Sequence, residues 1–419
     1  MSSRSHEDAH RAIESVARES YGRLVAFLCA RTRDVAGAED ALGEALVAAL
    51  ATWPREGTPK SPEGWLLTAA RRRLIDRLRH ERVQAESAPT LKLVIGNHRG
   101  DDDEESALGP VIPDERLKLL FVCAHPAIDP DMHTPLMLQA VLGLDAAAIA
   151  RAFLVSPTAM GQRLVRAKTK IREAGIAFEL PEAHELAQRL DAVLNAIYAA
   201  FGSGWEDADG SDPRARGLAD EAIWLARVLR ARLPDEPEVR GLLALMLYCE
   251  SRRPARRDED GRFVPLSEQD PRLWTGAMID EAEHELADAA PKARPGRFQL
   301  EAAIQSVHAE RARSGNTDWS AIVWFYERLV ELSPAIGVRV GRAAAVAEIE
   351  GPRAALALLD EIEEESVQSY QPYWAVRAHL LKQLRRGQEA DEAFDRAIGL
   401  AEDDAVRRFL LERRGPTLG

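Results

Sequence analysis

The chain has 419 residues, 46% of them hydrophobic, and a formal net charge of −13. This length fits two or three domains. No run of about 18 apolar residues occurs, which excludes a membrane-spanning helix. The first ten residues lack the apolar core of a secretory signal, and three widely separated cysteines argue against a disulfide framework. We therefore expect a cytoplasmic protein without disulfides.

The charge is unevenly distributed along the chain. Residues 1–180 hold 24 basic and 25 acidic side chains, whereas residues 181–419 hold 31 and 43. Segments 65–82 and 151–172 carry net charges of +4 and +6, and segment 83–115 between them carries −6. Basic segments of this size can neutralise nucleic-acid phosphates, although one such segment alone is more often a solvated helix face. Two of them, each on a predicted helix, favour nucleic-acid binding.

Apolar residues recur at helical spacing along almost the whole chain, which predicts an all-α protein. One helix is expected over residues 14–32. A second is expected over residues 38–53, with Leu42, Leu46 and Leu50 on one stripe.

A third helix is expected to begin where a stretch with three prolines and a glycine ends. Ser61 supplies an N-cap and Pro62 the first helical position, and the helix continues to about Arg82. The segment 83–112 contains DDDEE, glycines and prolines without sustained periodicity, which predicts an acidic flexible linker. The first domain is therefore expected to span residues 1–82.

Residues 113–178 are expected to form a second helical domain with a helix-turn-helix pattern. A short helix ending at Phe153 is followed by Ser156 and Pro157, again an N-cap and a first helical position. The inward stripe of the second helix is Met160, Leu164, Ala167 and Ile171. Its outer face carries Thr158, Gln162, Arg163, Arg166 and Lys170. Glutamine and arginine pair with adenine and guanine edges, so this face suits base reading in the major groove; an ordinary bundle with a charged face is the alternative.

The C-terminal part, residues 183–419, shows a period of 36 residues. The period relates Gly315, Gly351 and Gly387; Ala321, Ala357 and Ala393; Ile322, Leu358 and Phe394; and Tyr326, Ile362 and Ile398. Glycine is expected in a turn, alanine where two helices approach closely, and the apolar residues in the groove between them. A helical repeat near 34 residues is typical of tetratricopeptide units, which stack into an α-solenoid with a binding face.

In their order along the chain, these features resemble a bacterial RNA polymerase sigma factor of the extracytoplasmic-function type. The resemblance rests on DVAGAEDALGEALVAAL (34–50), PEGWLLTAARRRLIDRLR (62–79) and LDAAAIARAFLVSPTAMGQRLVRAKTKIREAG (144–175). In that family the three segments grip the polymerase clamp, read the −10 promoter element and read the −35 element. The remainder resembles a subgroup with a tetratricopeptide-like extension, through FVCAHPAID (121–129), GLLALMLYCESRRPAR (241–256), QDPRLW (269–274), QLEAAIQSVHAE (299–310) and TDW (317–319). Gly43 stands where the family usually has Gln, and Ala124 where the subgroup often has Cys.

The resemblance implies promoter-specific transcription initiation, with core RNA polymerase and promoter DNA as partners and no membrane. The implied polymerase-binding residues are Glu39, Asp40, Glu44 and Leu46. The residues expected at the −10 element are Lys60, Arg72, Arg73, Arg77 and Arg79. Those expected at the −35 element are Ser156, Thr158, Gln162, Arg163, Arg166 and Lys170.

The C-terminal extension is expected to be regulatory, and two functions are open for it. In the first, it is a protein-binding module that masks or exposes the N-terminal domains. In the second, it senses a small molecule. Candidate pocket residues are Arg253, Arg256, Gln269, Asp270, Trp274, His308, Asp318 and Trp319. A buried polar network that holds helices together is the structural alternative. A different class is a tetratricopeptide adaptor or ligand-sensing protein whose helix-turn-helix does not act through polymerase.

An enzyme or metalloprotein finds little support in the sequence. Cys123, His125 and His133 are the candidate metal ligands, and their spacing fits no standard zinc pattern. The chain lacks phosphate-loop, nucleophile-elbow, zincin and dinucleotide-binding motifs. We therefore predict no metal, no cofactor and no catalytic activity.

Overall fold

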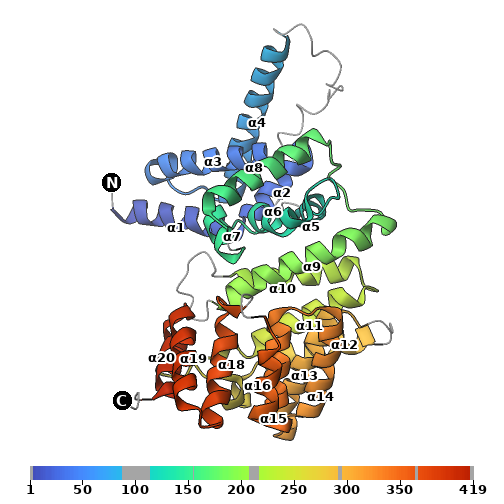
Figure 1. Ribbon diagram of the computed structural model, residues 1–419. Helices are drawn as coiled ribbons and strands as arrows, with labels where there is room; N and C mark the ends of the chain where they lie inside the picture. The colour runs from blue at the N-terminus through green and yellow to red at the C-terminus, as the bar shows by residue number, and fades with distance from the viewer. Residues whose placement is uncertain are drawn as a thin grey trace. The chain divides into compact units, whose positions relative to one another are not determined.

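Helices form every regular element in the part of the chain that the structure describes (Figure 1). The structure is a computed structural model, and it describes residues 3–86, 114–153, 155–206, 217–290, 295–363 and 367–415. Within these ranges there is no strand, only an isolated antiparallel bridge between Arg257 and Phe263. The all-α prediction is confirmed. In the same ranges, no helix is long and apolar enough to cross a membrane.

Contacts divide the chain into two compact units, residues 1–225 and 226–419. The first begins with α1 (Ser3–Glu19), α2 (Tyr21–Thr32), α3 (Val35–Glu56) and α4 (Pro62–Glu86). The helix expected over 14–32 is therefore two helices, because the backbone leaves the helical conformation at Ser20. Most of the predicted linker, from residue 87, lies outside the described residues.

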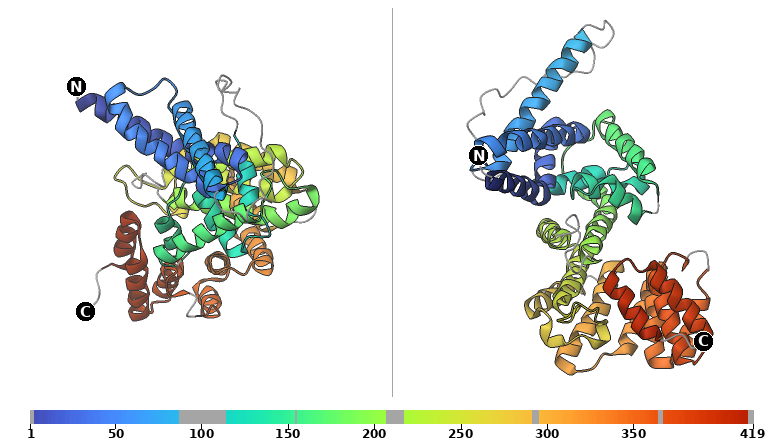
Figure 2. Two further views of the ribbon diagram at one scale, coloured as in Figure 1. Left: turned by 90° about the horizontal axis from the view of Figure 1, so that it is seen from above. Right: turned by 90° about the vertical axis from the view of Figure 1, so that its left-hand side faces the viewer.

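Helix termini in this region follow the sequence signals, but two boundaries differ. Asp34 caps α3 by accepting a hydrogen bond from the Gly37 amide at 3.1 Å, and Ser61 does the same for Gly64 at 3.4 Å. Helix α3 continues through Pro54 to Glu56, so the loop before α4 is shorter than expected. Helix α4 continues four residues past the expected end, to Glu86, and projects beyond its neighbours in unit 1 (Figure 2).

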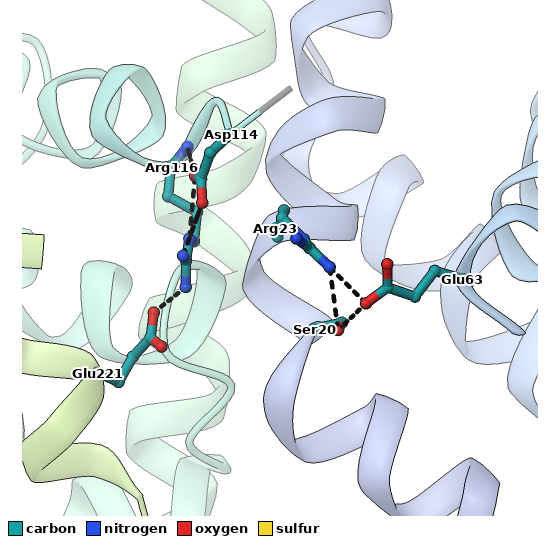
Figure 3. Close-up of polar contacts among 6 residues, drawn as sticks. All are labelled: Ser20, Arg23, Glu63, Asp114, Arg116 and Glu221. Atoms are coloured by element: carbon teal, nitrogen blue, oxygen red, sulfur yellow. Dashed lines mark hydrogen bonds and ion pairs between the residues drawn. The ribbon is translucent and has the colours of Figure 1, made fainter. Parts of the chain in front are cut away.

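A polar cluster fastens α4 to α2 (Figure 3). The Arg23 guanidinium and the Ser20 hydroxyl both donate to the Glu63 carboxylate, and Arg23 also donates to Ser20 at 3.4 Å. All three groups are partly buried, so the carboxylate is satisfied away from bulk water. The cluster fixes where α4 begins relative to α2.

The next helices of unit 1 are α5 (Arg116–Cys123), α6 (His133–Ala140), α7 (Ala146–Ala152) and α8 (Pro157–Glu173). The structure confirms the expected positions of the last two within one residue. The four residues predicted for the inward stripe of α8 are all buried: Met160, Leu164, Ala167 and Ile171.

Two further helices belong with this group. Helix α9 (Ala183–Glu206) packs on α5 and α6, and α10 (Leu218–Arg232) contains the division between the units. The first unit therefore extends beyond the predicted boundary at residue 183. Arg116 ties α5 to α10: its guanidinium lies between Asp114 and Glu221 (Figure 3) and 4.3 Å from the centre of the Trp224 ring.

The second unit is a row of helices in which, from α11 onward, each described helix contacts the next along the chain (Figures 1 and 2). After α10 these are α11 (Pro237–Ser251), α12 (Gly276–Ala289), α13 (Arg297–Ser314), α14 (Trp319–Leu332), α15 (Ile336–Glu350), α16 (Pro352–Asp360), α18 (Gln371–Gln383), α19 (Gly387–Leu400) and α20 (Asp404–Arg414). Short 3₁₀ turns at 253–255, 266–268 and 271–273 lie between α11 and α12.

The 36-residue period corresponds to successive helix pairs, but residues related by the period do not occupy equivalent positions in the structure. Gly315 and Gly351 each follow a helix at positive φ, as predicted for turns, whereas in the third pair the residue at positive φ is Arg385. Ala357 is exposed, contrary to expectation, and Ala355 takes the buried position. The physical reason is the differing turn length, because α14 starts four residues after its glycine and α16 starts one residue after.

The segment between α11 and α12 reaches both α13 and α20. Phe263 packs edge-on against Phe409, with ring centres 5.4 Å apart. Arg257 pairs with Asp403. Arg311 donates to three main-chain carbonyls, two in the 3₁₀ turn at 266–268 and one at the residue that follows it. The segment therefore links helices far apart in the sequence of unit 2.

Glu238 of α11 caps the neighbouring helix α13. Its carboxylate accepts hydrogen bonds from the amides of Phe298 and Gln299 at 2.9 and 3.1 Å. We expect Glu238→Ala to lower the free energy of unfolding by about 2 kcal/mol, because two helix-terminal donors lose a charged acceptor. Thermal or urea unfolding measures this loss, with the exposed Glu259→Ala as the matched control. A loss no larger than that of the control would contradict the capping role.

Candidate polymerase and promoter interfaces

Helix α3 presents a mixed acidic and apolar face. Asp40 and Glu44 are exposed, and so are Val47 (66% exposed) and Leu50 (41%). These four positions lie on one side of the helix because each follows the one before it by three or four residues. The side facing the core is formed by Ala38, Ala41, Leu42, Ala45, Ala49 and Trp53.

The three leucines that were predicted to share one stripe of α3 differ in their burial. Leu42 is buried and Leu46 is half-buried, but Leu50 faces solvent, because the small alanines take the core positions against α1, α2 and α4. Val47 and Leu50 were missed as surface residues by the sequence analysis. Their helical spacing from Asp40 and Glu44 was the signal that could have found them.

Glu39 lies apart from this exposed face. Its side chain is only 13% exposed and forms an ion pair with Lys168 of α8, which is 9% exposed. Burial raises the pKa of the Glu39 carboxyl, and the ammonium of Lys168 opposes the rise. The carboxylate of this predicted polymerase-binding residue is therefore already paired with a side chain of the same protein.

Two of the predicted −10 residues pair with predicted polymerase-binding residues. On α4, Arg73 contacts Glu44 at 2.5 Å and Arg77 contacts Asp40 at 3.3 Å. Exposed ion pairs of this kind contribute about 0–1 kcal/mol, so they exchange readily for other partners.

The remaining three predicted −10 residues, Lys60, Arg72 and Arg79, are exposed. Lys60 lies in the loop between α3 and α4, and the two arginines lie on α4. Trp65 at the start of α4 packs edge-on against the buried Trp53, with ring centres 5.5 Å apart. This aromatic contact holds the loop that carries Lys60 between two anchored helices.

Helix α8 presents the side chains predicted for the −35 element. Ser156 caps the helix by accepting from the Ala159 amide at 3.2 Å. The predicted outer residues are all exposed: Thr158, Gln162, Arg163, Arg166 and Lys170. Val165, which the sequence analysis missed, is 64% exposed on the same side. The face thus combines amide, guanidinium and apolar groups, the last suited to a thymine methyl.

Three of the predicted regulatory residues gather around Arg311 of α13. Its guanidinium lies 5.1 Å from the centre of the buried Trp274 ring and donates to the Gln269 carbonyl at 3.0 Å. His308 packs edge-on against Trp319. Burial, with Arg252 and Arg311 nearby, lowers the pKa of His308 to about 4, so this imidazole is neutral at pH 7.

The other predicted regulatory residues have local partners. Arg253 pairs with Glu250, and burial with two neighbouring arginines lowers the pKa of Arg256 to about 10. Asp270 and Asp318 cap a 3₁₀ turn and α14. A groove of about 850 Å³ between α12 and α13 includes only Asp318 of the eight predicted residues. Only some of the eight predicted residues therefore belong to the packed polar network around Arg311.

The histidines considered as metal ligands serve as hydrogen-bond partners of the backbone. The His133 ring nitrogen lies 3.1 Å from the Ile128 carbonyl, and the His125 ring accepts from the Ala127 amide at 3.1 Å. Within the described ranges, no group of three or more His, Cys, Asp or Glu side chains is placed to hold a metal ion.

Two segments of the chain match known protein families, and almost the whole chain is similar to one known protein. Residues 16–83 match the family described as Sigma-70 region 2, and residues 189–290 match a family of unknown function, DUF6596. Uncharacterized protein R00370 of Rhizobium meliloti (strain 1021) is 41% identical over 399 residues, which cover 95% of this chain and 93% of that protein. Yeast Tom70 aligns over 98% of this chain and 84% of its own at 13% identity, but a TM-score of 0.32 carries no argument about fold or function.

Proposed function

Because the chain belongs to the family of Rhizobium meliloti protein R00370 and carries a Sigma-70 region 2 domain at residues 16–83, we propose that it is a sigma factor of the extracytoplasmic-function type. It binds core RNA polymerase and directs promoter-specific transcription initiation. The sigma-70 region 2 match supports a role in transcription initiation through polymerase and promoter DNA. The observation that carries the proposal is the exposed acidic and apolar face of α3, which lies inside the matched segment.

Helix α3 binds the polymerase in this proposal. Exposed Val47 and Leu50 would be buried on docking, which supplies the hydrophobic driving force. Asp40 and Glu44 beside them repel DNA phosphates and favour a basic protein surface. Leu46 supports the face from its half-buried position.

Helices α4 and α8 read the promoter in this proposal. Lys60, Arg72 and Arg79 contact the −10 element, where their charges offset the cost of unstacking a base. Arg73 and Arg77 join them once they leave their acidic partners on α3. Exposure of the outer face of α8 supports its role at the −35 element, with Gln162, Arg163 and Arg166 reading bases and Lys170 and Thr158 contacting phosphates.

The second unit is the regulatory part in this proposal. It carries a net negative charge, since residues 226–419 hold 28 basic and 34 acidic side chains. Its helices pack as successive pairs, an arrangement that suits binding of a protein or peptide. A tetratricopeptide adaptor that never meets polymerase is the competing function, and co-purification with core polymerase subunits distinguishes the two.

The α3 face provides the first test of the proposed function. We expect the double substitution Val47→Ser/Leu50→Ser to weaken binding to purified core polymerase by at least ~10-fold, because two apolar contacts are lost. Charge reversal of Asp40 and Glu44 should weaken it as well. The Val47→Ser/Leu50→Ser variant should keep its thermal stability because both side chains are exposed, whereas charge reversal also breaks the weak ion pairs with Arg77 and Arg73. Leu411→Ser, at an exposed position of α20, is the matched control. Unchanged affinity in both variants would remove this face from the interface.

The α8 face provides the second test. We expect Arg166→Ala and Arg163→Ala each to cost about 1–3 kcal/mol of promoter binding if the arginine reads a base, with relaxed sequence preference at one position. Lys170→Ala should weaken binding to all sequences alike and reduce its salt dependence. Exposed Arg328→Ala on α14 serves as the control. Normal promoter-directed transcription by the Arg163→Ala/Arg166→Ala double variant would show that this helix does not read the −35 element.

The second unit provides the third test. A chain ending after Leu233 keeps all of α9 and α10. A shorter truncation near residue 180 would remove α9 from α5 and α6, and α10 from Arg116 of α5. We expect this truncated factor to transcribe less than the full chain at matched protein levels, because the second unit supports a productive arrangement of the promoter-reading helices. Increased transcription would show instead that the second unit masks them, and equal transcription would contradict any regulatory role.

A further inference from the structure

The second unit contains a groove that is lined by four successive helices, α11 to α14. Helices α12 and α13 both pack on α11 (Figure 1), and the groove of about 850 Å³ lies between them. This volume is within the ~300–1,000 Å³ that is usual for ligand sites. Leu286, Val307 and Ala321 contribute to its apolar lining. The groove is therefore large enough to hold a ligand, and it is separate from the polar network around Arg311.

Tyr248 of α11 lines this groove and carries a hydroxyl that makes no hydrogen bond. The residue is only 1% exposed, and its hydroxyl oxygen is buried without a hydrogen-bond partner in the described part of the chain. Burial raises the pKa of the Tyr248 phenol, and the Glu283 carboxylate raises it further, whereas Arg313 opposes the rise. The phenol therefore keeps its proton at neutral pH. Because a buried hydroxyl without a hydrogen bond costs free energy, its place beside a groove points to a ligand that accepts from it.

The walls of the groove carry more acidic than basic side chains. The lining residues include three acids, Glu283, Glu310 and Asp318, but only one base, Arg313, which leaves a formal charge of −2. Arg313 contacts Glu283 at 2.7 Å and Glu310 at 3.3 Å, and all three side chains are more than one third exposed. Such exposed pairs are weak, so the carboxylates remain available to a second cation. The charge of the groove therefore favours a basic ligand.

We propose that this groove binds an extended segment of a partner protein in which a lysine or arginine neighbours apolar residues. A main-chain carbonyl of the segment accepts the hydrogen bond from Tyr248, since every peptide unit carries such an acceptor. The basic side chain binds the excess carboxylates, and the apolar side chains cover Leu286 and Val307. A small polyamine would also bind the carboxylates, but it offers no acceptor to the Tyr248 hydroxyl. The inference names the ligand of the second unit, and its regulatory meaning rests on the proposed function.

The groove is tested with the full-length protein and a phage-displayed library of random heptapeptides. Selection on the immobilised protein should enrich peptides in which a basic residue neighbours apolar ones. The selected peptides are then synthesised, and their affinities are measured by fluorescence polarisation. Ala287→Trp places a bulky side chain at an exposed position of the groove wall, so it should abolish binding. Enrichment of acidic peptides, absence of enrichment, or equal binding by Ala287→Trp would overturn the proposal.

Tyr248→Phe separates a binding role of the hydroxyl from a structural one. Because the hydroxyl has no partner among the described residues, its removal should leave the unfolding temperature unchanged or raise it. Peptide affinity should nevertheless fall ~2- to 10-fold, as expected for one lost neutral hydrogen bond. Glu310→Gln should lower the affinity by about 2- to 5-fold. Its matched control is Glu389→Gln, because the ion pair of Glu389 with Arg386 is similarly exposed. Unchanged peptide affinity in Tyr248→Phe would contradict the assignment of the hydroxyl.

Spermidine serves as the competing probe in the same assay. Binding of spermidine more tightly than any selected peptide would overturn the peptide in favour of a small polyamine. All of these measurements are made without polymerase, so their failure would leave the proposed function intact. Retained peptide binding by a protein that supports no transcription would instead overturn the proposed function and leave the groove as a peptide site.

Discussion

The close contact between region 2 and the α5–α8 helices is the constraint on which unit 1 depends. Gly22 touches the Val141 backbone, and Glu39 and Lys168 neutralise each other between α3 and α8. Two groups of helices that the sequence separates by an acidic segment are thereby held against one another. A buried ion pair adds little net stability, because desolvation offsets its attraction, but it specifies one arrangement.

The exposed ion pairs between α3 and α4 also hold acidic and basic side chains together, but without the desolvation penalty of a buried pair. Asp40 and Glu44 pair with Arg77 and Arg73, so the acids assigned to polymerase and the arginines assigned to DNA satisfy each other while the protein is alone. Each pair is solvent-exposed and weak, so both partners can be exchanged for stronger ones. When a basic protein surface and a DNA backbone are both present, the acids can bind the protein surface and the arginines can bind the DNA, so the pairs separate.

Local signals in the sequence predicted the local structure well, and long-range contacts escaped it. Ser61 and Ser156 marked helix starts because capping depends on neighbours three residues away, and the buried stripe of α8 followed from helical spacing. The Glu39–Lys168 pair joins residues 129 positions apart, which no periodicity encodes. The shared stripe of the α3 leucines did not predict which of them is buried, because small alanines fill the core side of the helix and Leu50 remains exposed. Only some of the predicted regulatory residues lie together in one polar network. The sequence did not predict this, because Arg311, which joins them, was not among the candidate residues.

The most direct measurement is transcription in a purified system. Core RNA polymerase, the full-length protein and fragmented genomic DNA are combined, and the 5′ ends of the transcripts are mapped. The account predicts new start sites that require the protein and share two sequence elements about 25 base pairs apart, with weaker use of the upstream element by Arg166→Ala. Transcripts that are identical with and without the protein, although it is folded and in excess, would contradict the account.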